Sequence, residues 1–124
     1  MEVQIKDLLE TAAHYALLTE LAEAIFKGEG MQIVDGQVVS DSIEVEDAEA
    51  LCLLVQSLSN VLKNLKIDNI DVNNLEQELP NIHPCNKPRV MGYGIMAEYC
   101  RLDNRPHEIN QWERRFNDAL NGKN

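Results

Sequence analysis

The sequence predicts a mainly α-helical protein, with α+β character only at the margin. We expect a compact bundle of about four helices, with one β-hairpin between the first two long helices. Three observations favour this fold: apolar residues recur at helical spacing in long segments, one Asp-Gly pair joins two β-branched runs, and the composition is ordinary for a globular chain. The 124 residues suit a single domain over 1–124. We divide it into an acidic helical part over 1–79, a loop over 80–88, and a near-neutral to basic helical tail over 89–122.

The first predicted helix covers residues 3–27, a segment without proline or glycine. Gly28 and Gly30 are the signals that end it. Its apolar residues spread over more than one face, which indicates a helix between two layers or in a self-association interface. They are Ile5, Leu8, Leu9, Ala12, Ala16, Leu18, Leu21, Ala22, Ile25 and Phe26.

The next segment, residues 31–39, contains two short β-branched runs joined by Asp35 and Gly36. Asp-Gly suits the positive φ values of a two-residue type I′ turn, so we predict a β-hairpin. A lone hairpin is marginally stable in water. It is therefore expected to lie on the helices or to pair with strands elsewhere.

The helix predicted over residues 48–65 is the one around which we expect the chain to pack. Its early turn, residues 51–55, is apolar almost all round, which is typical of a helix covered on several sides. Ser57, Asn60 and Asn64 are expected on the far side. The residues expected on its inner face are Leu51, Leu54, Val55, Leu58, Leu62 and Leu65.

The connection after this helix is rich in Asn and Asp and leaves room for one short strand or none. Asn73 or Asn74 is a candidate cap for a brief helix over residues 75–79, which Pro80 would end. Three prolines over residues 80–88 then predict an irregular loop.

The segment over residues 88–102 fits either a helix or a strand. Gly92 and Gly94 would each cost a helix about 1 kcal/mol, so in a helix they would mark a close crossing or a break. Residues 106–120 are clearly amphipathic, with Gly122 as the stop signal. The inner face of that last helix is Ile109, Trp112, Phe116 and Leu120.

The charge is unevenly distributed. The formal net charge is −10, and residues 1–79 contain sixteen carboxylates against four lysines. Such a chain repels nucleic-acid phosphates and anionic membranes, so we expect no membrane partner and regard direct nucleic-acid binding as disfavoured. Acids before a helix are also favoured by its dipole, which is the simplest explanation of the first cluster. The candidate partner-binding residues are Asp41, Glu44, Glu46, Asp47, Glu49, Asp68, Asp71, Glu76 and Glu78.

No arrangement typical of catalysis or metal binding is evident. The chain has no phosphate-cradling glycine loop and no nucleophile with an adjacent base, so we expect neither an enzyme nor a cofactor. His83, Cys85, Cys100 and His107 have the residue types of a zinc site, but their spacing is unlike that of the familiar zinc modules. The sequence leaves open whether these four come together, and we predict no metal.

The leading functional hypothesis is a small acidic, non-enzymatic protein that blocks or modulates a partner macromolecule, as an inhibitor, immunity protein, anti-defence factor or DNA mimic does. Its partner would present a basic surface, such as that of a nucleic-acid-binding protein. An odd number of cysteines, no leader and no long apolar run favour the cytoplasm.

Two alternatives belong to other functional classes. The tail has a faint likeness to a helix-turn-helix regulator, in which Asn110, Gln111, Arg114 and Arg115 would contact nucleic acid. The other alternative is an oligomeric small-ligand-binding module, in which helix 3–27 forms a homodimer and the loop over 80–88 lines a pocket.

Overall fold

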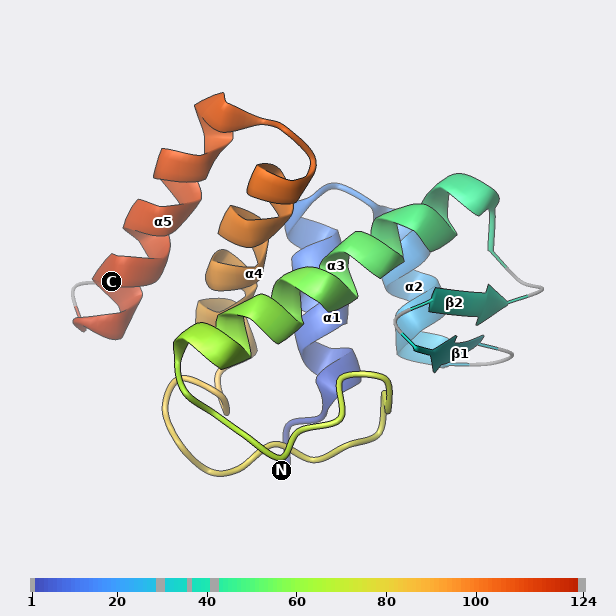
Figure 1. The fold of residues 1–124 in the computed structure, drawn as a ribbon, viewed down its shortest axis with the longest axis horizontal. Coiled ribbons are helices and arrows are strands. Elements are labelled where there is room, and N and C mark those ends of the chain that lie inside the picture. The colour runs from blue at the N-terminus through green and yellow to red at the C-terminus, as the bar shows by residue number, and fades with distance from the viewer. Residues whose placement is uncertain (1, 29–30, 36, 41–42, 123–124) are drawn as a thin grey trace.

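The computed structural model describes residues 2–28, 31–35, 37–40 and 43–122, and within these ranges the chain forms five helices and one antiparallel hairpin. Figure 1 shows their order along the chain. The elements are α1 (Ile5–Tyr15), α2 (Thr19–Lys27), β1 (Met31–Val34), β2 (Gln37–Ser40), α3 (Val45–Asn64), α4 (Pro88–Leu102) and α5 (Pro106–Leu120).

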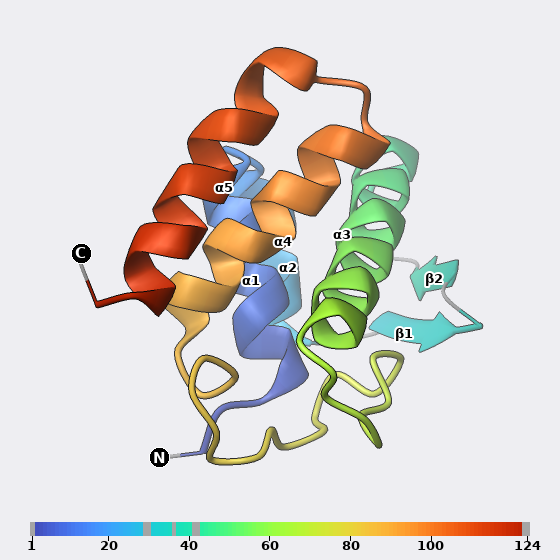
Figure 2. The same ribbon diagram turned by 60° about the vertical axis from the view of Figure 1, so that its left-hand side comes forward.

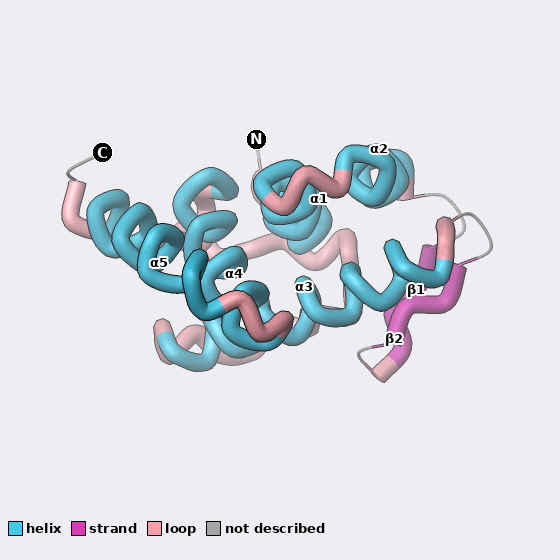
Figure 3. The backbone as a smooth tube through the Cα atoms, turned by 90° about the horizontal axis from the view of Figure 1, so that it is seen from above, coloured by secondary structure: helices cyan, strands magenta, loops and turns pink. Residues whose placement is uncertain are grey.

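The helices pack in layers, and this confirms the predicted mainly helical bundle. The α1–α2 pair lies behind α3, and α4 packs against α1, α3 and α5 (Figures 1 and 3). The hairpin and α5 lie at opposite ends of the molecule (Figure 3). The central position expected for the helix over 48–65 is thus shared by α3 and α4. Every helix in the described part of the chain is too short or too polar to cross a bilayer.

The single helix predicted over residues 3–27 is wrong, because the chain breaks between α1 and α2. Leu17 has a φ of 62°, and the Leu18 amide donates a hydrogen bond back to the Ala13 carbonyl. The two short helices pack against each other, and this buries Leu9 and Leu21 completely. The wide apolar surface that indicated self-association is therefore largely covered within one chain.

The hairpin forms at the predicted place. Ile33 pairs with Val38 and Val34 with Gln37, so Asp35 begins the turn with a φ of 52°. Its partner in the predicted turn, Gly36, lies outside the described residues. Ile33 is buried, whereas Val34 is exposed on the opposite face.

Helix α3 has the predicted inner face, although it begins three residues earlier than expected. Leu51, Leu54 and Leu58 are fully buried. The placement of Ser57 on the far side is wrong, since its side chain is also fully buried. Burial is tolerated because the Ser57 hydroxyl donates a hydrogen bond to the Leu53 carbonyl at 2.6 Å.

The brief helix predicted over residues 75–79 is also wrong. Residues 75–76 form a turn, and residues 77–79 lie beside the amino-terminal residues, with an isolated antiparallel bridge between Gln4 and Glu78. The Ile5 amide donates to the Gln77 carbonyl at 3.0 Å, and the Leu79 amide to the Val3 carbonyl at 2.9 Å. The connection between α3 and α4 therefore runs beneath the ends of α1, α3 and α4 (Figures 1 and 2). Residues 80–87 are irregular, as predicted.

The segment over 88–102 is helical, and its glycines mark close crossings. A Cβ added at Gly92 would lie 2.7 Å from Cε2 of Tyr15 in α1. One added at Gly94 would lie 2.9 Å from Cζ of Phe116 in α5. The two glycines thus let α1 and α5 approach α4 more closely than any side chain would permit.

Candidate functional site

The first acidic cluster surrounds the beginning of α3. Glu44 is the extended N-cap residue, and Glu46 and Asp47 lie in the first turn, where carboxylates stabilise the helix through its dipole. Glu44, Glu46 and Glu49 are exposed, and Asp47 is half-buried. Asp41 lies outside the described residues. Stabilisation of the helix through its dipole therefore explains why these acids lie at the beginning of α3. Three of them still face solvent and are free to contact another molecule.

Within the described part of the chain, no cation forms an ion pair with the carboxylates of this cluster. Among the described residues, the ion pairs lie within α1, within α2, and in the tail. Arg101 is paired with Glu98 and Glu113, and Arg105 with Asp103 and Glu108. Arg101 and Arg105 are thus compensated within the tail, whereas Arg114 and Arg115 are exposed and form no ion pair in the described part of the chain. We call Asp35, Glu44, Glu46, Asp47 and Glu49 the acidic face, and none of its members forms an ion pair within the described part of the chain.

The second predicted cluster does not form one surface. Asp71 and Glu76 line a polar hollow of about 600 Å³ together with Lys6 and Lys27. Asp68 is exposed. Glu78 lies beside Glu2 near the amino terminus, where a hydrogen bond from one carboxyl to the other and their mutual repulsion raise the pKa of Glu78. The four acids of this cluster therefore lie in three separate places on the surface.

A groove of about 640 Å³ brings the acidic face against an apolar surface. One wall is α3, and the other is formed by Asp35 of the hairpin turn and by Val72 and Asn73 of the connection. Two of its lining residues, Asp35 and Glu49, carry carboxylates, and we call them its rim. Leu53 and Val72 are apolar, and we call them its floor. We call it the acidic groove, and its lining residues are Asp35, Glu49, Cys52, Leu53, Val55, Gln56, Ser59, Val72 and Asn73.

Sequence reasoning missed most of this groove, although one signal for it was present. Residues 49, 52, 53 and 56 share one face of α3 because they are spaced by three and four. The apolar turn over 51–55 indicated cover on several sides, yet Cys52 and Leu53 remain only half-buried. This chain covers the opposite face of α3 and leaves this one open.

The tail does not have helix-turn-helix geometry. Helices α4 and α5 run side by side in opposite directions, joined by residues 103–105 (Figures 1 and 2), whereas helix-turn-helix motifs cross at about 90–120°. Asn110, Gln111, Arg114 and Arg115 are all exposed on α5. The guanidinium of Arg115 lies 4.7 Å from the ring centroid of Trp112, which is itself buried as predicted.

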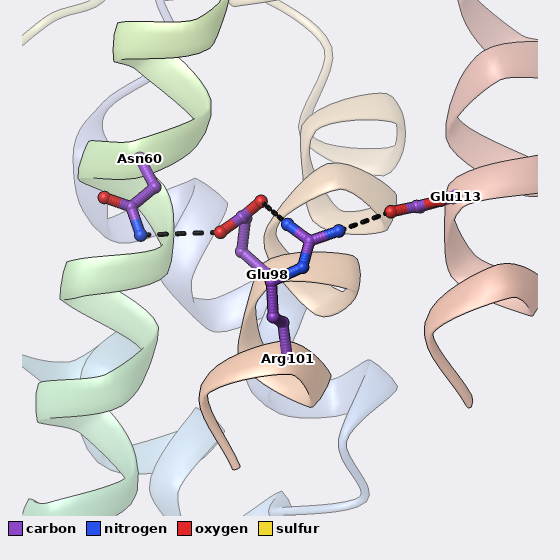
Figure 4. A network of polar contacts seen from close by, with 4 residues as sticks. All are labelled: Asn60, Glu98, Arg101 and Glu113. Atoms are coloured by element: carbon purple, nitrogen blue, oxygen red, sulfur yellow. Dashed lines mark hydrogen bonds and ion pairs between the residues drawn. The ribbon is translucent and has the colours of Figure 1, made fainter. Parts of the chain in front are cut away.

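A polar network holds three helices together at this end of the molecule (Figure 4). Glu98 of α4 accepts a hydrogen bond from the Asn60 amide of α3 at 3.4 Å and is bound by Arg101. Arg101 also donates to Glu113 of α5 at 2.6 Å. Only 12% of the Glu98 side chain is exposed, so its carboxylate is satisfied by these partners more than by bulk water.

The four zinc-type residues do not assemble. His83 and His107 are exposed, whereas Cys85 and Cys100 are fully buried. Across the described residues, no three His, Cys, Asp or Glu side chains are grouped in a way that could hold a metal ion. Cys85 and Cys100 are free thiols whose pKa values are raised by burial.

Comparison of the chain with protein families, with curated proteins and with solved structures finds no match. The candidate site is the acidic groove, an apolar surface bordered by two carboxylates that form no ion pair within the described part of the chain. Such a surface offers both an apolar contact area and a strong preference for positive charge.

Proposed function

We propose that this chain is a non-enzymatic, cytoplasmic binding protein that blocks or modulates a partner macromolecule by covering a basic surface with its acidic face. The observation that carries this proposal is the contrast in charge pairing. Arg101 and Arg105 in the tail are each held by two carboxylates, while the acidic face contains none that is paired within the described part of the chain. Unpaired, exposed carboxylates retain their long-range field.

The physical consequence is electrostatic steering. Carboxylates on one side of a molecule raise the rate at which a basic partner is encountered, and added salt screens that attraction over a Debye length of about 8 Å at physiological ionic strength. The association rate should therefore fall steeply with salt, while the dissociation rate changes less. An interface dominated by apolar contacts alone would lack this dependence.

A matched pair of charge variants tests the proposal. Glu46→Gln/Glu49→Gln removes two charges from the acidic face, and Glu20→Gln/Glu23→Gln removes two exposed charges from α2. Glu46 and Glu20 both lie in the first turn of their helix. Glu23 also forms an exposed ion pair with Lys27, so the control variant additionally loses about 0.3–0.5 kcal/mol of helix stability. Tagged wild type would capture its partner from nuclease-treated lysate of the source cell, and the affinity of the purified pair would then be measured at low and high salt.

The α3 variant is expected to bind about fivefold more weakly, since two charge contacts contribute about 0.5 kcal/mol each. The α2 variant should bind as wild type does. Equal weakening by both variants would mean that only net charge matters, and full affinity in the α3 variant would remove the acidic face from the interface. Circular dichroism and urea unfolding of both variants verify that each is folded.

A further inference from the structure

We propose that the acidic groove receives one segment of the partner, a basic amphipathic stretch whose apolar side chains rest on Leu53 and Val72 and whose lysines or arginines lie beside Asp35 and Glu49. This inference deepens the proposed function and rests on it. It identifies which part of the acidic face makes close contact, and which chemistry the partner must present there.

The floor of the groove calls for apolar side chains. Helix α3 is apolar nearly all round in the turn over 51–55, and the chain buries Leu51, Leu54 and Val55. Cys52 and Leu53 on the other side stay half-buried, and Val72 meets them from across the groove. A space of about 640 Å³ holds several side chains. Under the proposed function, we infer that the occupant is a segment of the partner's chain.

The rim of the groove calls for positive charge. Asp35 is fixed at the hairpin turn by the pairing of Val34 with Gln37, and Glu49 projects from α3. Neither carboxylate has an ion-pair partner within the described ranges. A purely apolar segment would desolvate both acids without compensation, and an acidic one would repel them. A basic residue next to the apolar ones satisfies both.

The polar hollow on the other side of the connection lacks this preference. There Asp71 and Glu76 share the lining with Lys6 and Lys27, so acids and cations balance locally. Its lining is also richer in polar groups, with Gln32, Asn73 and Asn74. Of these two sites, only the acidic groove combines an apolar floor with carboxylates that have no lysine or arginine in the same lining.

Cys52 provides a direct report on occupancy of the groove. It is half-buried in the groove lining, whereas Cys85 and Cys100 are fully buried and their pKa values are raised by burial. Iodoacetamide therefore modifies Cys52 first in the native protein, because thiolate and access are both required. Mass spectrometry of tryptic peptides identifies the modified thiol and gives its rate.

Three synthetic peptides serve as probes: an amphipathic leucine–lysine peptide, its leucine–glutamate counterpart, and its serine–lysine counterpart. The leucine–lysine peptide is expected to slow alkylation of Cys52 at least fivefold, and the other two should leave the rate unchanged. Protection by serine–lysine alone would reduce the groove to a nonspecific cation surface. Equal protection by all three, or by none, would also overturn the inference.

Charge variants complete the experiment. Asp35→Asn/Glu49→Gln should lose the protection by the leucine–lysine peptide, while Glu20→Gln/Glu23→Gln keeps it. Asparagine tolerates the positive φ of residue 35, so the turn is preserved. Protection that persists in the groove variant would contradict the role of the rim.

The captured partner separates failure of this inference from failure of the proposed function. If the partner binds through the acidic face but leaves Cys52 as reactive as before, the groove assignment is overturned and the proposed function stands. If no macromolecule is retained although the leucine–lysine peptide protects Cys52, the proposed function fails and the preference of the groove remains.

Discussion

The two glycines of α4 lie under aromatic rings, but the rings differ in their freedom to move. Tyr15 over Gly92 packs against both Tyr93 and Trp112, with ring centroids 5.4 and 5.7 Å away, and those two rings also contact each other. Phe116 over Gly94 borders a hollow of about 250 Å³ into which its ring can shift. A methyl group is therefore accommodated more easily at position 94 than at position 92.

We predict that Gly92→Ala lowers the free energy of unfolding by about 1 kcal/mol, because overpacking against Tyr15 outweighs the gain in helix propensity. Gly94→Ala should stay within about 0.5 kcal/mol of wild type, since the two effects nearly cancel. Urea unfolding monitored by circular dichroism measures both. Equal stability of the two variants would show that the Tyr15 ring is free to move.

Ser57 shows why some burial patterns escape sequence reasoning at this scale. Its polar side chain predicted a solvent-facing position, but the hydroxyl is satisfied by the Leu53 carbonyl of its own helix. Serine can therefore enter a core without any partner from another element. Asp35 was likewise interpreted only as a turn residue, and its place at the groove rim depends on packing between the hairpin and α3.

At the scale of elements, Arg101 joins α4 to α5 and also compensates a nearly buried carboxylate. We predict that Arg101→Gln costs about 1–2 kcal/mol, because the nearly buried Glu98 carboxylate loses a close hydrogen-bonded partner. Arg105→Gln should cost about 0.5 kcal/mol, since 34% and 47% of the side chains of its partners are exposed. Thermal or urea unfolding measures both variants.

A double variant provides the control for this network. In Glu98→Gln/Arg101→Gln a neutral amide replaces the Glu98 carboxylate, so part of the stability lost in Arg101→Gln should return. A double variant less stable than Arg101→Gln would mean that Glu98 stabilises the bundle by a route other than this ion pair, such as its hydrogen bond to Asn60.

The helices and the hairpin were predictable because local periodicity and turn chemistry specify them. The two errors in segments have non-local causes. Residues 75–79 do not form a short local helix because their backbone forms hydrogen bonds with residues 3–6, which lie far away in sequence. The break at Leu17 lacks glycine or proline and follows from packing α1 against α2. For the site, Glu49 was found from sequence, but Asp35 was interpreted as a turn residue. Leu53 and Val72 were classed as core or connection.

For the whole molecule, buried thiols and phenols set the response to alkaline pH. Burial raises the pKa values of Cys85, Cys100, Tyr15 and Tyr99 in the folded state. The unfolded chain therefore releases these protons first, and the native state binds more protons above the unfolded cysteine pKa of about 9. Stability should be unaffected by these groups below that pH and fall as the pH rises further.

Urea unfolding at about pH 8 and about pH 10 measures this loss. In Cys85→Ala/Cys100→Ala the decline should be shallower, because only the tyrosines still contribute. A decline as steep as in wild type would assign the effect to Tyr15, Tyr99 or other groups. Stability that rises over this range would contradict the direction of all four shifts.

The bridge between Gln4 and Glu78 also determines when the acidic groove can exist. Val72 and Asn73 belong to the connection whose later residues form backbone hydrogen bonds with residues 3–6. This wall of the groove therefore forms only when two distant parts of the sequence come into contact. As the chain leaves the ribosome, the hairpin and α3 are complete well before residue 79 appears. Contacts of such long range form late in folding. A nascent chain thus forms its hairpin and α3 first, and the groove is complete only after residue 79 has been added, with α4 and α5 still to be synthesised.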